Sequence, residues 1–199
     1  MALKHKIWLF RHGETEWSKT GQHTGRSDIP LTDMGREQAE ALGRRLAGRN
    51  FALVLSSPLS RALDTCKLAG FGDGVGITED LLEWDYGAYD GRRTVDIQKD
   101  RPGWLVWKDG VIDGETVEQV GVRARRVIDR VTDVDGDVAM FSHGHMLRIL
   151  GASWVGLPPV GGQLLALGTA ALSVLGYEHD YRVIQIWNQD PHLVMEHSP

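Results

Sequence analysis

The sequence predicts an α/β fold, a single-domain three-layer sandwich in which a mostly parallel central sheet carries helices on both faces. Short apolar runs rich in β-forming residues alternate with longer segments of helical periodicity. Polar or basic residues follow several of these runs directly, as they do at the ligand-binding edge of an open sheet. The 199 residues are 42% hydrophobic and 25% charged, which is typical of one globular domain spanning 1–199.

Charge and cysteine content exclude several classes of function. The formal charge is -5, from 22 Lys+Arg against 27 Asp+Glu, and no basic block occurs. Nucleic acid and an anionic membrane are therefore not expected as partners. No apolar run approaches a signal-peptide core or a membrane span, so we expect a cytoplasmic protein. Cys66 is the only cysteine, which excludes intrachain disulfides and thiolate metal sites. The sequence leaves open whether the chain forms a homo-oligomer.

The first predicted strand, at 6–10, ends in Arg11-His12-Gly13. A guanidinium beside an imidazole offers an anion-binding fork next to a nucleophile or proton carrier, and the glycine lets the backbone approach a ligand closely. Alone, this tripeptide favours a solvated basic turn. A second apolar run, at 138–141, also ends in His-Gly, at His143-Gly144. The recurrence favours a site built from both strand ends.

A polar loop and a helix follow the first strand. The loop at 14–26 is rich in hydroxyl, imidazole and guanidinium groups, so its residues are candidates to line a polar site as well as to form an ordinary solvated loop. Thr32 is expected to cap a helix that reaches Gly48 and serves packing rather than chemistry.

The second predicted strand, at 51–55, leads into a helix that Ser57 is expected to cap, with Pro58 at its first position. Arg61 then falls on the first turn, where its charge adds to unpaired backbone N–H groups in a place suited to phosphate. A surface arginine is the alternative interpretation. Cys66, on the same helix, is expected to be a buried structural thiol.

A short strand at 75–78 leads to Glu83, which lies between two leucines and Trp84. Partial desolvation there would raise the pKa of the carboxyl group and suit a proton donor, whereas a simple ion pair with an arginine is the alternative. The segment 88–110 contains several breaks and one expected short helix, and we interpret it as a lid or specificity segment.

The helix predicted over 115–131 has the clearest apolar periodicity in the chain. Its arginines are interpreted as a solvated face: Arg123, Arg125, Arg126 and Arg130. The remaining expected elements are a strand at 138–141, a helix at 145–155 and a hairpin of strands at 171–177 and 182–187.

Candidate groups thus share a position just beyond a predicted strand, on one edge of one sheet: Arg11 with His12, Arg61, Glu83 and His143. In these residues the sequence resembles the histidine phosphatase superfamily, which includes cofactor-dependent phosphoglycerate mutases and many phosphomonoesterases. The motifs that carry the resemblance are Arg11-His12-Gly13-Glu14-Thr15-Glu16-Trp17, Thr24-Gly25, Leu31-Thr32-Asp33-Met34-Gly35, Ser56-Ser57-Pro58-Leu59-Ser60-Arg61-Ala62, Glu83 with Tyr86-Gly87, Gly114-Glu115-Thr116 and Ser142-His143-Gly144.

The resemblance implies that His12 is a nucleophile that forms a phosphohistidine. By the same match Arg11, Arg61 and His143 hold the equatorial oxygens, while Glu83 protonates the leaving oxygen and later activates water. A covalent intermediate, a cationic clamp and a proton donor each lower the barrier of a reaction that enzymes accelerate by up to ~10²¹-fold. No metal or other cofactor is implied. His12 needs one free ring nitrogen, which a backbone carbonyl bonded to the other nitrogen would secure.

The chain departs from the mutase pattern where those enzymes grip a phosphoglycerate. Ser18 and His145 stand where mutases usually carry asparagine, Lys108-Asp109 follows Trp107 where they carry two arginines, and the segment 107–114 is shorter than theirs. These departures favour a phosphomonoesterase acting on a small phosphorylated metabolite. The expected substrate-binding residues are Ser18, Thr24, Gly25, Gly144 and His145.

Three alternatives remain beside this leading interpretation. A cofactor-dependent phosphoglycerate mutase is the runner-up. A non-catalytic phosphoprotein-binding module is another, although the presence of both His12 and Glu83 speaks against it. A metallohydrolase built on His12, His143 and His145 lacks supporting Asp/Glu-His ligand spacing. Neutral imidazole is favoured above ~6.5 and a protonated glutamate below ~4.3 unless burial raises it, so mildly acidic activity is expected.

Overall fold

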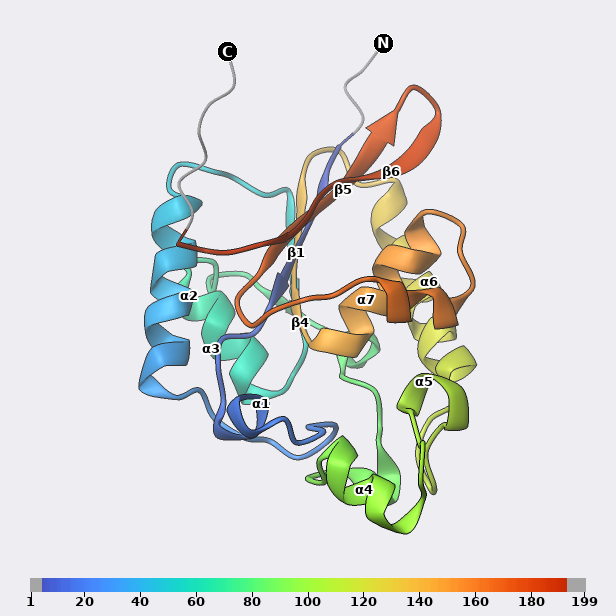
Figure 1. Cartoon of the computed structure of the whole chain (residues 1–199). Helices are drawn as coiled ribbons and strands as arrows, with labels where there is room; N and C mark the ends of the chain where they lie inside the picture. Colours follow the sequence, from blue (N-terminus) through green and yellow to red (C-terminus); the bar gives the residue numbers. More distant parts are fainter. Residues whose placement is uncertain (1–4, 193–199) are drawn as a thin grey trace.

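A six-stranded sheet of order β3-β2-β4-β1-β5-β6 forms the centre of the computed structural model, which describes residues 5–192 (Figure 1). The parallel part is made of β1 (Ile7–Arg11), β2 (Leu53–Ser56), β3 (Gly76–Ile77) and β4 (Val138–Ser142). The antiparallel part is the hairpin of β5 (Leu172–Glu178) and β6 (Tyr181–Gln189), which joins the sheet beside β1. The predicted mostly parallel sheet is confirmed.

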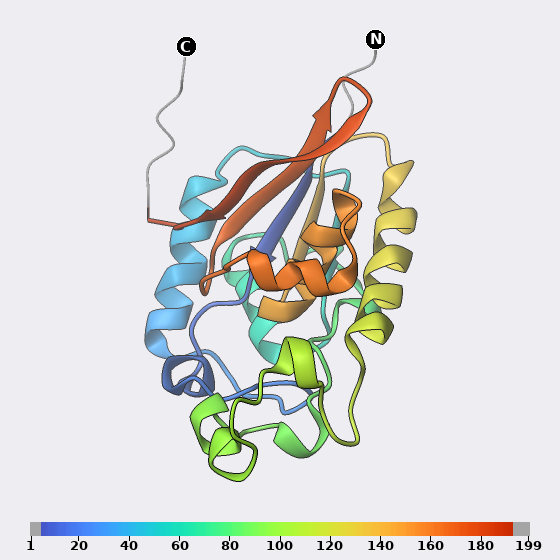
Figure 2. The same cartoon turned by 45° about the vertical axis from the view of Figure 1, so that its right-hand side comes forward.

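Two hydrophobic cores lie on opposite faces of this sheet because neighbouring residues of a strand point to opposite sides. Leu9 and Met140 belong to the core beneath α6 (Val117–Thr132) and α7 (Gly144–Trp154). Phe10 and Phe141 belong to the core beneath α2 (Asp33–Arg45) and α3 (Ser60–Leu68), where the buried Cys66 also packs. Figure 2 shows α2 and α6 on opposite sides of the sheet, which makes the three layers.

Side-chain caps set the start of two helices, and the sequence predicts the first of these caps, at Thr32. Thr32 Oγ1 accepts a hydrogen bond from the Gly35 N–H at 3.1 Å, and α2 begins at the next residue. Thr116 and Gln119 form a reciprocal capping box at the start of α6. The helix α2 ends at Arg45, earlier than the predicted Gly48, whereas α6 follows the predicted bounds closely.

The start of α3 corrects one prediction. The helix begins at Ser60, not at Pro58, and Ser57 does not cap it. Asp28 does instead, because its Oδ1 accepts from both the Ser60 N–H at 2.9 Å and the Ser60 hydroxyl at 2.8 Å. The first turn of α3 therefore presents fewer unpaired N–H groups to an anion than the sequence suggested, although Arg61 does lie on that turn.

The connections gather beyond the carboxyl ends of the parallel strands, at the lower end of the molecule in Figure 1. These connections comprise α1 (Glu16–Thr20), the 3₁₀ turns η1 (Glu79–Leu81) and η2 (Gly87–Tyr89), α4 (Thr94–Asp100) and α5 (Val106–Asp109). A further 3₁₀ turn, η3 (Pro159–Leu164), packs against α7. Within residues 5–192 no helix has the length and apolarity needed to cross a membrane.

Candidate active site

The two His-Gly strand ends meet at one edge of the sheet. The register of β1 and β4 pairs Arg11 with Ser142, and the His12 N–H donates to the Ser142 carbonyl at 3.0 Å. A histidine follows each of these two strands directly, and the ring centroids of His12 and His143 are 5.3 Å apart. The expectation that the two motifs form one site is therefore consistent with the geometry.

The ring of His12 has one nitrogen fixed and one available. Its Nδ1 lies 2.7 Å from the Gly13 carbonyl, which can only accept, so Nδ1 carries the proton and Nε2 keeps its lone pair. The side chain is 4% exposed. Burial lowers the pKa of His12 well below 6.5, and the positive charges of Arg61 and Arg11 lower it further. His12 is thus a neutral imidazole with a free Nε2.

The second histidine, His143, is also neutral. Arg61 Nε donates to His143 Nδ1 at 3.2 Å, so the proton of the neutral ring is on Nε2, which lies 2.8 Å from the Ser57 hydroxyl. Burial lowers the pKa of His143 well below 6.5, with further lowering by the charges of Arg61, His12 and Arg11. This corrects the expectation of a potentially cationic group, because His143 offers an N–H donor but no charge.

Arg61 holds the polar loop in place. Its Nη1 donates to the Ser27 carbonyl at 2.8 Å, and its Nη2 donates to the carbonyls of Thr24 and Gly25 at 3.2 and 3.0 Å. The Gly25 N–H in turn donates to Asp90 at 2.7 Å. The expected substrate residue Gly25 therefore contacts Arg61 through its backbone.

Arg11 presents an unused donor to the site. Its Nη1 donates to the Leu167 carbonyl at 2.5 Å, whereas its Nε is buried and has no partner among the described residues. The absence of a side chain at Gly144 leaves room here, since a Cβ would lie 3.4 Å from Arg11 Cζ. A buried guanidinium N–H without a partner is costly unless a ligand satisfies it, which suits an anion.

Glu83 lies at the amino-terminal end of α7. Its Oε1 accepts from the N–H groups of Trp84 and Met146, both at 2.9 Å, and its Oε2 accepts from the His145 N–H at 3.0 Å. The residue is 5% exposed, so the predicted desolvation is confirmed. Because Oε2 has one donor and Oε1 has two, Oε2 is the oxygen with capacity left to carry a proton.

These groups surround a cavity of about 190 Å³. Seven of the predicted residues line it: Arg11, His12, Ser18, Thr24, Glu83, Gly144 and His145. Arg61, His143 and Gly25 do not line it, but Arg61 binds the carbonyls of Thr24 and Gly25, and His143 lies against His12. Five further residues line the cavity without having been named as binding residues: Gln22, His23, Tyr86, Arg148 and Leu167. The first two lie in the polar loop 14–26 and Tyr86 lies in a family motif, whereas Arg148 and Leu167 were missed altogether.

Comparison with known proteins decides the family. The family model described as Histidine phosphatase superfamily (branch 1) matches residues 7–190. This chain belongs to the histidine phosphatase superfamily. It is 41% identical to an acid phosphatase of Mycobacterium tuberculosis, over 92% of this chain and 91% of that protein. It is 36% identical to a sedoheptulose 1,7-bisphosphatase of Saccharomyces cerevisiae, over 78% and 69% of the two chains.

A solved structure confirms the fold of this histidine phosphatase. The product of an open reading frame of Mycobacterium tuberculosis superposes with a TM-score of 0.89 at 41% identity, covering 94% of this chain and 99% of that chain. The sequence-based resemblance to the superfamily is confirmed, and the chain is a phosphoric monoester hydrolase of the phosphatase type.

One wall of the cavity in this histidine phosphatase is aromatic and imidazole-rich. The Tyr86 hydroxyl is hydrogen-bonded to His145 Nδ1. Burial and the nearby Glu83 carboxylate raise the pKa of Tyr86 well above 10, so the phenol is the donor. Burial lowers the pKa of His145 well below 6.5, which leaves a neutral ring with its proton on Nε2. His145 therefore offers a fixed N–H donor to a bound molecule.

Arg148 lies on the same wall, one helical turn after Gly144 on α7. Its guanidinium stacks on Trp107, with Cζ 4.8 Å from the ring centroid, and donates to the carbonyls of Gly162 and Gln163 at 3.1 and 3.2 Å. No carboxylate pairs with it among the described residues. The spacing from the His-Gly motif is the signal that would have found this arginine.

Arg123 corrects another expectation. It is 8% exposed rather than part of a solvated face, and it pairs with Glu115. Its position between Val120 and Ala124 of the apolar stripe was the available signal.

Within residues 5–192 no group of three or more His, Cys, Asp or Glu side chains is arranged to hold a metal.

Proposed function

We propose that this phosphatase hydrolyses phosphomonoesters of small metabolites through a phosphohistidine intermediate on His12. The observation that carries the proposal is the hydrogen bond from His12 Nδ1 to the Gly13 carbonyl, which leaves the neutral Nε2 with its lone pair in a cavity that Arg11, with an unpartnered N–H, also lines. A lone pair and an anion-binding donor in one cavity are what attack on a bound phosphate requires.

In the first step, His12 Nε2 attacks phosphorus, an N–P bond forms, and the P–O bond to the leaving group breaks. Glu83 Oε2 gives its proton to the departing oxygen. In the second step, Glu83 takes a proton from water as the water oxygen attacks phosphorus, and the N–P bond breaks. Arg11 binds the phosphoryl oxygens in both steps. Arg61 holds the carbonyls of Thr24 and Gly25, and His143 lies against His12, so these two residues position the groups around the phosphoryl oxygens.

The cavity favours a small substrate with a second anionic group. Its volume of about 190 Å³ is below the roughly 300 Å³ at which drug-sized ligand pockets begin. Arg148 is held by Trp107 and two backbone carbonyls with donors to spare, so it is preorganised for an anion. The similarity to a sedoheptulose 1,7-bisphosphatase supports a second phosphate on the substrate.

Substrate preference tests that assignment. Fructose 1,6-bisphosphate and 6-phosphogluconate are expected to react with kcat/KM at least about 10-fold above glucose 6-phosphate, and Arg148→Met should remove the difference. Arg44→Met, at an exposed arginine of α2, is the matched control for charge loss. Equal kcat/KM for all three sugars in the unaltered enzyme contradicts a second anion site.

The leaving group separates the role of Glu83 from that of His12. Glu83→Gln should react very slowly with an alkyl phosphate, whose alkoxide cannot leave unprotonated. With p-nitrophenyl phosphate it should release a burst approaching one equivalent of nitrophenolate per site, followed by weak turnover, because the phenolate leaves readily and water attack still needs the carboxylate. His12→Ala should show no burst. Equal slowing of phosphoenzyme formation on both substrates would mean that Glu83 is not the leaving-group acid.

Two assays separate this function from its alternatives. Incubation with phosphoglycerate and catalytic bisphosphoglycerate should release phosphate faster than it interconverts isomers, and the reverse result identifies a mutase. Turnover should persist in excess EDTA because arginine and N–H donors bind the phosphoryl oxygens. Loss of turnover that zinc or magnesium restores identifies a metallohydrolase.

A further inference from the structure

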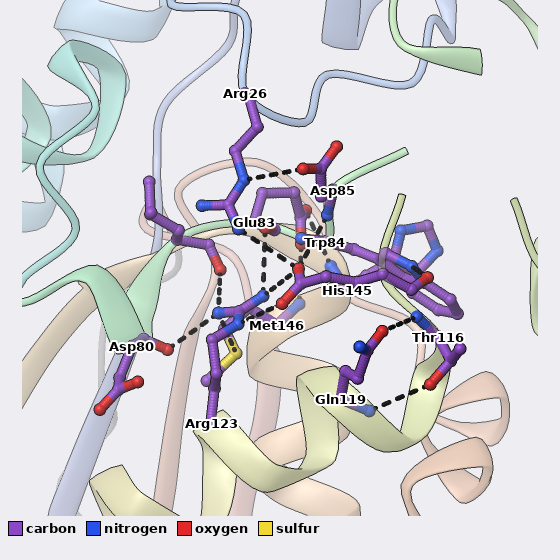
Figure 3. A network of polar contacts seen from close by, with 12 residues as sticks. Arg26, Asp80, Glu83, Trp84, Asp85, Thr116, Gln119, Arg123, His145 and Met146 are labelled. Atoms are coloured by element: carbon purple, nitrogen blue, oxygen red, sulfur yellow. Dashed lines mark hydrogen bonds and ion pairs between the residues drawn. The ribbon is translucent and has the colours of Figure 1, made fainter. Parts of the chain in front are cut away.

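A largely buried ion pair of Arg123 and Glu115, with side chains 9% and 18% exposed, contacts the segment that carries Glu83. Figure 3 shows Arg123 and Glu83 in this network. Arg123 of α6 binds Glu115 in bidentate fashion, with Nε to Oε1 and Nη2 to Oε2 both at 2.7 Å. Burial alone would raise the pKa of Glu115, but the hydrogen bond and charge of Arg123 outweigh it and lower the pKa. The pair is therefore fully charged at neutral pH.

The remaining donors of Arg123 bind the backbone next to Glu83. Its Nη1 donates to the carbonyls of Asp80 and Leu82 at 3.0 and 2.8 Å, and its Nη2 donates to the carbonyl of Glu83 itself at 3.3 Å. All five N–H donors of the guanidinium thus have an acceptor, two on Glu115 and three on this segment. The fork fixes three carbonyls of one irregular segment relative to helix α6.

Glu115 holds the other end of the same segment. Its Oε2 accepts from the Asp85 N–H at 3.0 Å, and its carbonyl accepts from Trp84 Nε1 at 2.8 Å. The Glu115 N–H donates to the Asp85 carbonyl at 3.0 Å. Residues on both sides of Glu83 are consequently tied to the ion pair.

Arg123 also contacts the helix that receives the Glu83 carboxylate. Its Nη1 lies 3.7 Å from Met146 Sδ, and the Met146 N–H is one of the donors to Glu83 Oε1. One guanidinium therefore touches both the backbone that carries the carboxylate and the residue that binds it. Figure 3 shows Arg123 directed from α6 toward Asp80 and Met146.

We propose that Arg123 and Glu115 are positioning residues that hold the Glu83 carboxylate against the leaving-group oxygen. The inference rests on the proposed acid role of Glu83. A buried ion pair contributes little net stability compared with apolar residues of similar volume, so stability alone gives a weak reason for building one here. An acid must be placed within hydrogen-bond reach of the oxygen it protonates, and the five bonds of Arg123 supply that placement.

The test compares kcat/KM for an alkyl phosphate, glycerol 2-phosphate, and for p-nitrophenyl phosphate. Arg123→Met should lower kcat/KM for glycerol 2-phosphate at least about 10-fold more than for p-nitrophenyl phosphate, because only the alkoxide needs the acid. Arg123→Lys should restore part of the difference. Glu115→Gln, which keeps Arg123 and its carbonyl bonds, should show a smaller effect in the same direction.

Arg126 provides the matched control on the same helix. Its exposed side chain pairs with the Asp80 carboxylate, so Arg126→Met removes an arginine near the same segment without touching Glu83. Both substrates should change by less than about twofold with this variant. Equal losses on both substrates in Arg123→Met and Glu115→Gln would show a merely structural pair and overturn the proposal. If Arg123→Met does not fold, Arg123→Lys and Glu115→Gln decide the outcome.

The Glu83→Gln background separates the two proposals. In that background Arg123→Met should add no further leaving-group selectivity, because the group that it positions is already absent. Additive selectivity overturns the positioning role. If Glu83→Gln itself shows no selectivity, the acid role of Glu83 fails. If Glu83→Gln is selective and Arg123→Met is not, only the positioning role fails.

Discussion

Three imidazoles of the site are neutral because of their burial. His12, His143 and His145 each have a pKa well below 6.5, with burial as the largest cause and nearby arginine charges as further causes. Neutrality has a different use in each ring. His12 keeps a lone pair on Nε2, as the proposed attack requires. His143 and His145 each keep a proton on Nε2, since Arg61 and Tyr86 occupy their Nδ1 atoms, and the His143 proton lies against the Ser57 hydroxyl.

The protonation state of His12 is measurable directly. The ring ¹⁵N chemical shifts of His12, assigned by comparison with His12→Ala, should report a neutral ring with its proton on Nδ1 at pH 6 and at lower pH values down to its depressed pKa. In the urea-unfolded protein the same ring should titrate near ~6.5. A folded-state titration at or above 6.5, or a proton on Nε2, would leave no nucleophile of the kind proposed.

At the residue scale the sequence predicts which groups occur in the site, but not their partners. The strand ends and family motifs predicted His12, Glu83 and His145 as site residues, and all three line the cavity. The bond from Arg61 to His143, which decides that His143 is neutral, joins residues 82 positions apart and depends on tertiary packing. No local pattern encodes such a contact.

At the element scale, the loop after β1 passes unusually close to the start of α2. A Cβ added at Gly13 would overlap the Gly35 carbonyl, and one added at Gly35 would overlap the Glu14 carbonyl. Thr32 strengthens this contact, because its N–H and hydroxyl bind the backbone and side chain of Glu14. The position of His12 therefore depends on Gly35, a glycine of α2.

Gly35→Ala should destabilise the protein, against the usual effect of this substitution in a helix. Alanine normally gains up to about 1 kcal/mol over glycine in a helix interior. Here the clash of the added Cβ with the Glu14 carbonyl outweighs that gain, and we expect a loss of about 1–3 kcal/mol in the free energy of unfolding. Urea denaturation measures it, with exposed Glu40→Ala on the same helix expected within about 0.5 kcal/mol of the parent. An increase in stability for Gly35→Ala contradicts the close contact.

Helix boundaries were predictable where the local sequence pattern sets them, and they were missed where a side chain distant in the sequence caps the helix. The apolar stripe of α6 predicted its bounds closely. The predicted start of α3 was wrong because Asp28, from a separate loop, supplies the cap. The prediction that Arg123 is solvated was wrong, because the carboxylate of Glu115, which lies outside the helix, pairs with it.

At the scale of the whole molecule, the buried neutral histidines tie stability to pH. Below ~6.5 the unfolded chain binds protons at these rings while the folded chain does not, so the free energy of unfolding falls as pH falls. Each ring contributes up to about 1.4 kcal/mol per pH unit between its unfolded and folded pKa. Urea midpoints from pH 7 to 5.5 should decrease, and His145→Gln should reduce the slope. A flat profile in this window contradicts neutral burial.

The fold as a whole was the most predictable feature. Alternating apolar runs and helical periodicities are local and repeat along the entire chain, so the three-layer arrangement followed from them. The cavity was less predictable, because its walls come from the 22–24 loop, the segment with Glu83 and Tyr86, and α7, which meet only in the folded molecule. Arg148, the arginine proposed to bind a second anionic group, was not predicted for the same reason.

Covalent phosphate on His12 is the central claim, and trapping it is the most direct test. Glu83→Gln, mixed with p-nitrophenyl phosphate and quenched in alkali, should carry one phosphate per chain on the peptide that contains Arg11-His12-Gly13. Mass spectrometry should place it on His12, and acid treatment should release it, as expected of a phosphorylated imidazole nitrogen. His12→Ala should carry none. Phosphate located on another residue, or hydrolysis of p-nitrophenyl phosphate by His12→Ala at the parent rate, contradicts the account.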